Sequence, residues 1–203
     1  MNPYVVIDIG GTSIKYGLAD AKGQLLETHE MPTEAQKGGP HILNTTKEIV
    51  ARYLKKHALA GVAISSAGMV DPDKGEIFYA GPQIPNYAGT QFKKEIEETF
   101  QIPCEIENDV NCAGLAEVTT GHAKGSNNAV CLTIGTGIGG CLLLDGQVFH
   151  GFSNSACEVG YLHLPDGAFQ DLASTTALVE YVAEHHGDPV EQWNGRRIFK
   201  QAT

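Results

Sequence analysis

Near the N-terminus, hydrophobic positions form short runs that end at glycine or at charged turns. The pattern predicts a strand over Tyr4–Ile9, a glycine turn, a second strand over Ser13–Ala19, a tight turn of sequence DAKG and a third strand. Because short turns join these consecutive strands, we expect them to form an antiparallel meander.

The middle of the chain changes to helical spacing. Residues 41–57 place apolar side chains on one face of a helix, and residues 90–101 also predict a helix. Between them, residues 60–71 predict a short strand that runs into a loop of Gly, Asp and Pro. Residues 102–109 predict a strand, and residues 110–125 predict a helix opened by a polar turn.

A second glycine-turn hairpin is predicted over Ala129–Leu144, about 120 residues after the first. Both stretches have an apolar strand, a glycine turn, another apolar strand and a turn containing Asp and Gly. This layout predicts two related halves, although two unrelated hairpins are the alternative.

The C-terminal part is less regular until residues 172–186, which predict a helix with Ser174 or Thr175 near its start. Residues 188–203 begin a further helical pattern that ends without a cap. We therefore expect the sequence to be part of a longer chain.

Composition narrows the class of protein. The 203 residues are 42% hydrophobic, and the net charge of −10 argues against a nucleic-acid or anionic-membrane partner. No segment reaches the roughly 18 continuous apolar residues of a membrane span. The five cysteines have neither CxxC pairing nor zinc-finger spacing, so we expect reduced thiols in a cytoplasmic protein.

The two glycine turns indicate phosphate binding. Phosphate oxygens approach a backbone closely only where no Cβ intervenes, and successive N–H groups then form an anion-binding concavity. Asp8 would be repelled by phosphate directly, so we interpret it as a ligand, through water, for the Mg²⁺ that accompanies ATP. Neither turn matches a P-loop or a Rossmann fingerprint, and either one alone is also explained as a structural hairpin. The predicted ATP- and phosphate-binding residues are Asp8 (through Mg²⁺), Gly10, Gly11, Thr12 and Lys15 in the first turn and Gly135, Thr136 and Gly137 in the second.

A cluster of polar residues lies where the strand over residues 102–109 meets the next helix. A kinase needs a carboxylate to take the proton from the attacking hydroxyl and an amide to orient that hydroxyl. Asp109 and Asn108 fit these two roles. The alternative is that Asp109 only caps the helix.

These motifs together resemble the ROK family of bacterial sugar kinases, in the actin/hexokinase/Hsp70-like superfamily. The resemblance covers essentially the whole chain, through DIGGTSIKYGL (8–18), AISSAGMVDPDKG (63–75), ENDVNCAGLAE (107–117), LTIGTGIGGCLLLDGQVFHG (132–151), ACEVGY (156–161) and LASTTALV (172–179). It implies a two-domain actin-like ATPase (ribonuclease H-like) α/β fold with an interdomain cleft. We expect an N-terminal α/β domain over residues 1–115 and the start of a C-terminal α/β domain over residues 116–203. The resemblance also implies ATP and Mg²⁺ as cofactors, a sugar substrate and a homodimer, in chains that usually continue well past residue 203.

The resemblance also implies roles for individual residues. Asp109 matches the catalytic base, and the expected substrate contacts are Gly68, Gln83, Asn108, Asp109, Glu158 and Tyr161. Gln83 replaces an Asn that many members have.

Departures from the family pattern suggest the type of sugar. Tyr161 stands where the family usually has a His that touches the sugar and ligates zinc, and Ala168 stands where a zinc-proximal Cys is expected. The sugar-binding Glu that follows becomes Gln170 or Asp171, and His163 lies two residues from the expected position. We therefore expect no structural zinc site, because one His without Cys cannot make four ligands, and a structural role for Cys157 and His163.

Tyr161, which ends a Glu-x-Gly-Tyr arrangement, resembles the residue that the β-glucoside kinases of this family have at this position. The resemblance then implies transfer of the γ-phosphate of ATP to the 6-hydroxyl of a glucosyl unit, in a β-glucoside such as cellobiose. A glucokinase or N-acylhexosamine kinase is the alternative within the family. A sugar-sensing binding protein is the alternative outside enzymes, although the first strand leaves no room for an N-terminal helix-turn-helix.

Overall fold

The computed structural model describes residues 2–202, which divide into two compact units between Cys112 and Ala113. The sequence predicted a boundary three residues later, between residues 115 and 116. Helix α3 (Asp109–Thr119) begins in the first unit and ends in the second.

The first unit is built on a five-stranded sheet with the order β3-β2-β1-β4-β7. Strands β1 (Tyr4–Ile9), β2 (Ser13–Ala19) and β3 (Leu25–Pro32) are antiparallel neighbours, as the sequence predicted. Strands β4 (Gly61–Ser66) and β7 (Cys104–Asn108) continue the sheet on the other side of β1 and run parallel to it. The parallel strands therefore end at the same edge of the sheet.

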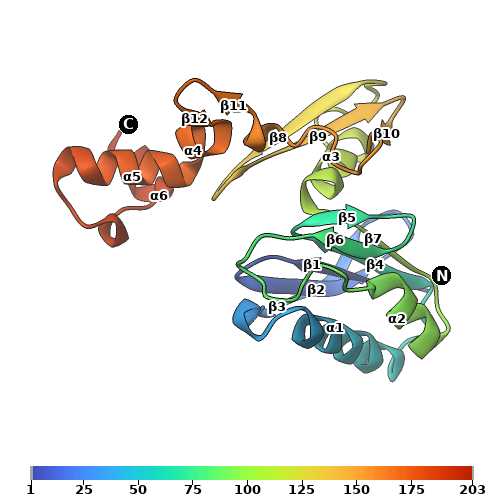
Figure 1. The fold of residues 1–203 in the computed structure, drawn as a ribbon. Helices are drawn as coiled ribbons and strands as arrows, with labels where there is room; N and C mark the ends of the chain where they lie inside the picture. The colour runs from blue at the N-terminus through green and yellow to red at the C-terminus, as the bar shows by residue number, and fades with distance from the viewer. Residues whose placement is uncertain (1, 203) are drawn as a thin grey trace. The chain divides into compact units, whose positions relative to one another are not determined.

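The core of the first unit lies where helices cover one face of this sheet. Val5, Ile7 and Ile9 of β1 are at most 2% exposed and join a cluster with Ile42 and Ile49 of α1 (Gly39–Leu54). Figure 1 shows α1 and α2 (Phe92–Phe100) on one side of the sheet, and the hairpin of β5 (Met69–Asp71) and β6 (Glu76–Tyr79) on the other. A short 3₁₀ turn, Ala35–Lys37, precedes α1.

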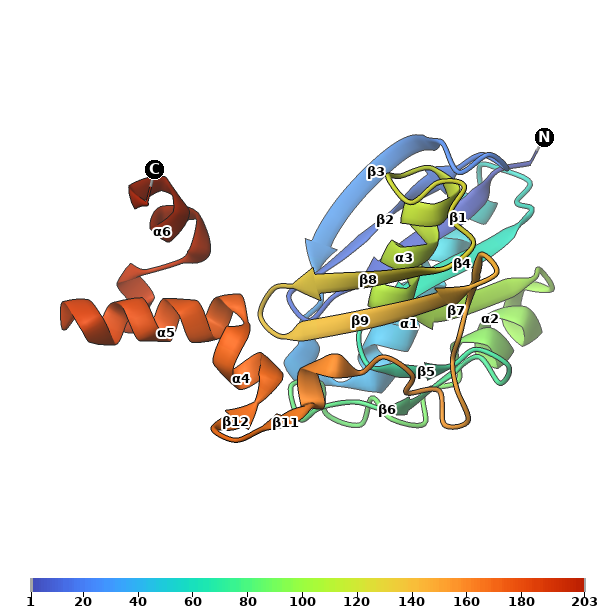
Figure 2. The same ribbon diagram turned by 90° about the horizontal axis from the view of Figure 1, so that it is seen from above.

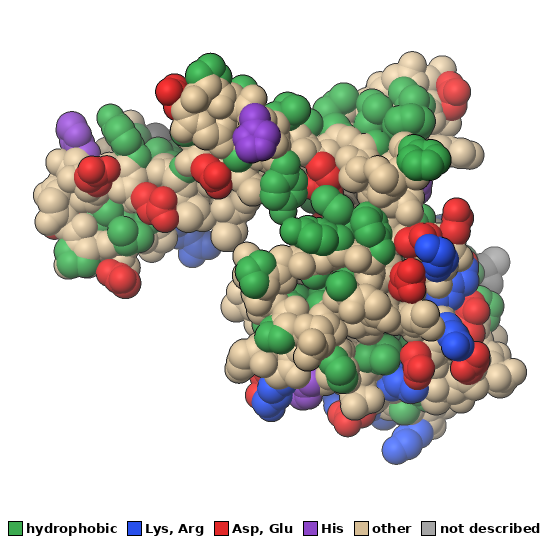
Figure 3. All heavy atoms as spheres, viewed as in Figure 1, with side chains coloured by type: hydrophobic (Ala, Val, Ile, Leu, Met, Phe, Trp, Pro, Cys, Tyr) green, Lys and Arg blue, Asp and Glu red, His purple; other side chains and the backbone are tan. Residues whose placement is uncertain are grey.

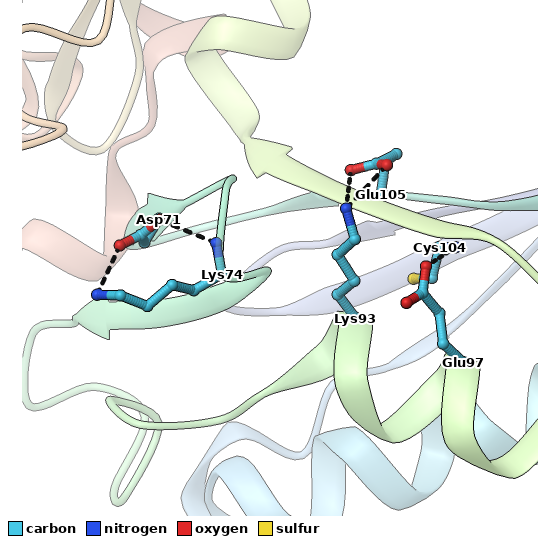
Figure 4. A network of polar contacts seen from close by, with 6 residues as sticks. All are labelled: Asp71, Lys74, Lys93, Glu97, Cys104 and Glu105. Atoms are coloured by element: carbon cyan, nitrogen blue, oxygen red, sulfur yellow. Dashed lines mark hydrogen bonds and ion pairs between the residues drawn. The ribbon is translucent and has the colours of Figure 1, made fainter.

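Polar contacts fasten α2 to β7 and close the β5–β6 turn (Figure 4). The Glu97 carboxylate of α2 accepts a 3.0 Å hydrogen bond from the backbone N–H of Cys104, and Lys93 pairs with Glu105 at 2.9 Å. Lys74 pairs with Asp71 at 2.9 Å across the turn. Such exposed ion pairs contribute little stability individually, so apolar packing remains the main support of this unit.

The second unit begins with a three-stranded sheet of order β10-β9-β8. Strands β8 (Ala129–Ile134) and β9 (Ile138–Leu144) form the second predicted hairpin, and β10 (Gln147–Val148) pairs with β9. Strands β8 and β9 have six and seven residues, the same lengths as β1 and β2. These equal lengths fit the repeat that the sequence predicted.

The remainder of the second unit is mainly helical. A 3₁₀ turn, Val159–Tyr161, leads to a small hairpin of β11 (His163–Leu164) and β12 (Gly167–Ala168). Then follow α4 (Phe169–Ala173), α5 (Thr175–His186), a 3₁₀ turn (Val190–Gln192) and α6 (Gly195–Gln201), as Figure 2 also shows. The helix predicted with Ser174 or Thr175 near its start is confirmed as α5, which begins at Thr175 and is capped by Ser174, whose Oγ accepts the N–H of Ala177. Residues 172 and 173, before this cap, belong to α4.

Charge is mixed on the visible surface. In Figure 3, Lys and Arg side chains on the first unit lie among Asp and Glu side chains, and they form no continuous basic face there. Across residues 2–202, none of the helices is both long enough and apolar enough to cross a membrane.

Candidate active site

The first unit gathers polar residues at the carboxyl ends of its parallel strands. The sheet register places Asp8 of β1 beside Ser65 of β4, and Ser65 beside Glu107 of β7. The next row carries Ser66 and Asn108. The carboxyl ends of parallel strands are where open α/β sheets usually bind ligands. Polar residues from three separate motifs therefore lie along one edge.

A hydrogen bond from Ser65 orients the Asp8 carboxylate at this edge. Its Oδ1 accepts from the Ser65 hydroxyl at 2.8 Å, while its Oδ2 lies 4.0 Å from the Lys15 ammonium. Both the Asp8 and the Lys15 side chains are about half exposed. The second carboxylate oxygen is therefore available to a ligand.

The surroundings of Asp8 suit a hydrated Mg²⁺ better than an ion held by protein alone. Mg²⁺ keeps several waters and binds through one or two carboxylates together with substrate phosphates. Among residues 2–202, no group of three or more His, Cys, Asp or Glu side chains is arranged to hold a metal ion. The single Asp8 carboxylate, with one oxygen accessible, therefore fits a Mg²⁺ ion that keeps most of its water ligands.

Asn108 organises the start of α3. Its Oδ1 accepts from the backbone N–H groups of Val110 and Asn111 at 2.9 and 3.1 Å, which is the geometry of an N-cap. Its Nδ2 donates to the Gly68 carbonyl and to Asp109 Oδ1, both at 3.0 Å. The cap is therefore Asn108, and Asp109 is the first residue of the helix.

The Asp109 carboxylate has the environment of a base with raised proton affinity. Although the side chain is open to solvent on one side, the surrounding protein atoms displace enough water to raise its pKa, and the charge of Asp8 raises it further. Hydrogen bonds from Val110 and Asn108 oppose this shift. Two carboxylates that repel each other at one edge favour a cation or a proton between them.

Gly68 and Gln83 lie in the loops beside this edge. Gly68 has a φ of 92°, and a Cβ there would lie 3.0 Å from the Tyr79 carbonyl oxygen, so glycine is required. Its carbonyl holds the Asn108 amide. The exposed Gln83 side chain folds over Gly81, and no hydrogen bond among the described residues joins it to Asn108 or Asp109.

The first glycine loop, residues 10–12, is open on one side and held on the other. A Cβ at Gly11 would meet nothing within 4 Å. On the held side, the Thr33 hydroxyl donates to the Gly10 carbonyl at 2.6 Å, and the Thr33 N–H donates to the Thr12 carbonyl at 3.0 Å. Thr33 is only 1% exposed, so this contact is part of the core.

The second glycine loop, residues 135–137, is likewise open on one side and hydrogen-bonded on the other. A Cβ at Gly135 would meet nothing within 4 Å. The start of α5 contacts the other side: the Thr175 N–H donates to the Gly135 carbonyl at 2.9 Å, and the Thr176 hydroxyl donates to the Thr136 carbonyl at 2.8 Å.

The segment carrying Glu158 and Tyr161 packs directly on β9. A Cβ at Gly140 would lie 2.3 Å from the Cys157 carbonyl oxygen, and one at Gly160 would lie 2.2 Å from the Ile138 carbonyl oxygen. These two glycines therefore let the segment approach the strand that follows the second loop. Tyr161 is 53% exposed and presents an accessible ring.

Among the departures from the family pattern, Gln170 lies close to the same loop. The Gln170 side-chain oxygen lies 2.9 Å from the position that a Gly137 Cβ would take, and 3.2 Å from that of Gly160. Asp171 follows it, exposed, in the first turn of α4. His163 pairs in register with Ala168 across the β11–β12 hairpin.

The sequence interpretation did not single out four residues that lie beside predicted site residues of their own unit: Thr33, Ser65, Cys112 and Thr176. Ser65 carried a usable signal, because it follows an apolar run at the place where Asp8 follows another. The two threonines carried none, since their partners lie more than twenty residues away. Burial raises the pKa of the Cys112 thiol to about 12, with Glu107 and both site aspartates acting in the same direction. The thiol therefore stays protonated at neutral pH and is no nucleophile.

Comparison with known proteins defines the family. The ROK family profile matches residues 4–202. The chain is 50% identical over 199 residues to uncharacterized protein CPE0188 of Clostridium perfringens, with 98% of this chain and 68% of that protein aligned. It is 31% identical to a glucokinase of Halalkalibacterium halodurans (91% of this chain, 57% of that protein) and 34% identical to a beta-glucoside kinase of Listeria monocytogenes (95% and 66%).

Solved structures give the same result. The Lmo2764 protein of Listeria monocytogenes superposes with a TM-score of 0.88 at 31% identity, over 98% of this chain and 70% of that one. A ROK family glucokinase from Streptomyces griseus, solved with glucose and AMPPNP, gives a TM-score of 0.77 at 29% identity, over 90% and 60%. The fold is that of the actin-like ATPases. The chain belongs to the ROK family, and it spans between 57% and 68% of the length of the three curated relatives named above.

Proposed function

We propose that this chain carries the catalytic base and the phosphate loops of an ATP-dependent sugar kinase. The observation that supports this most is the Asp109 carboxylate: Asn108 holds it, and its pKa is raised partly by Asp8 at the same sheet edge. A general base of raised pKa suits proton removal from an alcohol. The names of the relatives point to the same class of reaction.

In the proposed reaction, Asp109 takes the proton of a sugar hydroxyl as the oxygen attacks the γ-phosphorus of ATP. The new oxygen–phosphorus bond forms while the bond to the bridging oxygen breaks, and ADP leaves with that electron pair. The backbone N–H groups of the two glycine loops hold the phosphates. Asp8 would hold, through water, the Mg²⁺ that accompanies ATP, and the ion would supply charge neutralisation.

We propose the 6-hydroxyl of a glucosyl unit in a β-glucoside as the acceptor. The half-exposed ring of Tyr161 offers a stacking surface where the family usually has a His, and a sugar ring packs well on such a face. Glu158, beside it, is proposed to bind sugar hydroxyls, together with Gly68, Gln83 and Asn108. The beta-glucoside kinase at 34% identity supports this choice, whereas the glucokinase at 31% supports free glucose as the alternative.

The test is ADP release by the full-length protein with cellobiose, glucose or N-acetylglucosamine, coupled to NADH oxidation. We expect ADP release when the protein, ATP, Mg²⁺ and a sugar are all present, with the largest kcat/KM for cellobiose. Asp109→Asn is expected to abolish turnover, while the binding of sugar, measured by calorimetry, remains.

The matched control is Asp73→Asn, which removes a carboxylate from the exposed β5–β6 turn. It should keep wild-type turnover. Turnover that survives in Asp109→Asn would overturn the assignment of the base. Sugar binding without ADP release from the wild type would instead indicate a sugar-sensing protein.

A further inference from the structure

The two glycine loops lie in different units, but the same kind of hydrogen bond fixes their backbone carbonyls. In each, a threonine hydroxyl donates to one carbonyl of the loop, and a backbone N–H of a threonine donates to another. Thr33 supplies both donors to the first loop. Thr176 and its neighbour Thr175 supply them to the second.

These hydrogen bonds determine where the N–H groups of the second loop point. In a trans peptide, the C=O of one residue and the N–H of the next point in opposite directions, and there are no cis peptides among residues 2–202. The carbonyls of Gly135 and Thr136 both point to the start of α5. The N–H groups of Thr136 and Gly137 therefore both point away from α5, as a pair of donors for one anion.

The first loop follows the same rule. The Gly10 carbonyl points to the Thr33 hydroxyl, so the N–H of Gly11 points away from it. The loop is also open where a side chain of Gly11 would stand, because a Cβ there would meet nothing within 4 Å. A Gly10 carbonyl turned away from Thr33 would instead direct its oxygen where the N–H now points, and it would repel a phosphate oxygen.

We propose that Thr33 and Thr176 are positioning residues that preset the two loops for phosphate by holding their carbonyls away from it. This inference rests on the proposed function, because it takes the two loops as the phosphate sites. Neither threonine touches the phosphate. Their contribution is preorganisation: without the hydroxyl, part of the binding free energy is used to orient the loop.

A single substitution can remove the Thr176 hydroxyl while the rest of the loop contacts remain. The same substitution at the neighbouring Thr175 is the matched control. Thr176→Val deletes the donor at nearly constant volume. Thr175→Val makes the same change one residue earlier, where the bond to the loop comes from the backbone N–H and is kept. Thr176→Ser keeps the hydroxyl.

The measurement is calorimetric titration of the full-length protein with Mg²⁺·AMPPNP, together with KM for ATP and for the sugar. Loss of one hydrogen bond corresponds to roughly a two- to tenfold weaker interaction. We therefore expect Thr176→Val to weaken AMPPNP binding and raise KM for ATP by about that factor, with KM for the sugar unchanged. Thr175→Val and Thr176→Ser should behave as the wild type. Equal AMPPNP affinity in Thr176→Val and Thr175→Val overturns the proposal.

Thr33 is buried, so Thr33→Val is accompanied by Thr33→Ser and by thermal unfolding of each variant. We expect weaker AMPPNP binding in Thr33→Val and recovery in Thr33→Ser. If Thr33→Val does not fold, the Thr176 series decides the proposal by itself.

The outcomes separate this inference from the proposed function. A wild type that binds AMPPNP but phosphorylates no sugar would contradict the kinase, while the Thr176 series would still support or overturn the inference. A wild type that phosphorylates sugar, with AMPPNP affinity unchanged in Thr176→Val, would contradict the inference alone. A wild type that binds neither AMPPNP nor tripolyphosphate would overturn both.

Discussion

The carboxylates of Asp8 and Asp109 show how neighbouring residues acquire different properties from their surroundings. Asp8 accepts the Ser65 hydroxyl and faces Lys15, whereas Asp109 loses part of its hydration and lies in the field of Asp8. The pKa of Asp109 is therefore raised from its ordinary value. These two environments fit the proposed roles, Asp8 as a metal ligand and Asp109 as the base.

The raised pKa predicts how stability depends on pH. The folded chain binds the Asp109 proton more tightly than the unfolded chain. The resulting stabilisation is present below the unfolded pKa of about 3.9 and is lost as the pH rises through the folded pKa. Asp109→Asn removes this titration. We expect the free energy of unfolding of the variant, relative to wild type, to increase between pH 4 and pH 7.

Urea unfolding of both proteins at the two pH values measures this difference, with Asp73→Asn as the control for removal of a carboxylate. A difference between variant and wild type that stays constant, or that falls with pH, would contradict the raised pKa.

At the scale of elements, α3 packs on β9 through a glycine. A Cβ on Gly114 would lie 2.6 Å from Cys141 Sγ and 3.1 Å from the Cys141 Cβ and Leu143 Cδ1. Cys141 is buried at 0% exposure, so its sulfur has little room to move. The close approach of helix and strand therefore depends on the missing side chain.

Gly114→Ala tests this packing. Alanine in a helix is favoured over glycine by about 1 kcal/mol, but an extra methyl group in a packed core costs about 1–3 kcal/mol. We expect the clash to outweigh the propensity and the variant to lose about 1 kcal/mol of stability in urea unfolding.

A double-mutant cycle with Cys141→Ala separates the two effects, because it removes the sulfur that the new methyl group meets. In that background Gly114→Ala should become neutral or stabilising. An equal loss in both backgrounds would place the cause elsewhere than in the contact with Cys141.

For the whole molecule, the core is concentrated in the first unit. All buried members of the main hydrophobic cluster lie between Val5 and Ile106. In the second unit, the apolar side chains Val130, Leu132 and Ile134 of β8 are 48% to 64% exposed, and β8 is an edge strand. Few buried contacts and an open edge allow local opening at low free energy.

Native-state hydrogen exchange of the 203-residue chain tests this difference. We expect backbone amides of β1 and β4 to exchange slowest, at the rate of global unfolding, and those of β8 to exchange faster through local opening. Equal protection of β1 and β8 would show that the two units unfold as one.

The sequence by itself determined the β1–β2–β3 meander, the glycine turns and the family, but not the short β5–β6 and β11–β12 hairpins. Alternating and helical periods depend only on neighbouring residues, so the strands at Tyr4–Ile9 and Ser13–Ala19 were predicted to the residue. The six ordered motifs were sufficient to identify a ROK protein, as the match over residues 4–202 confirms.

Only the tertiary structure decided which of these residues meet. The bond of Ser65 to Asp8 depends on β4 lying parallel to β1, and the use of Asn108 as cap depends on Gly68, forty residues earlier in the chain. The threonine contacts behind both loops depend likewise on where β3 and α5 begin and end. Such contacts join residues distant in sequence, and their formation depends on sheet order and register, which local periodicity does not contain.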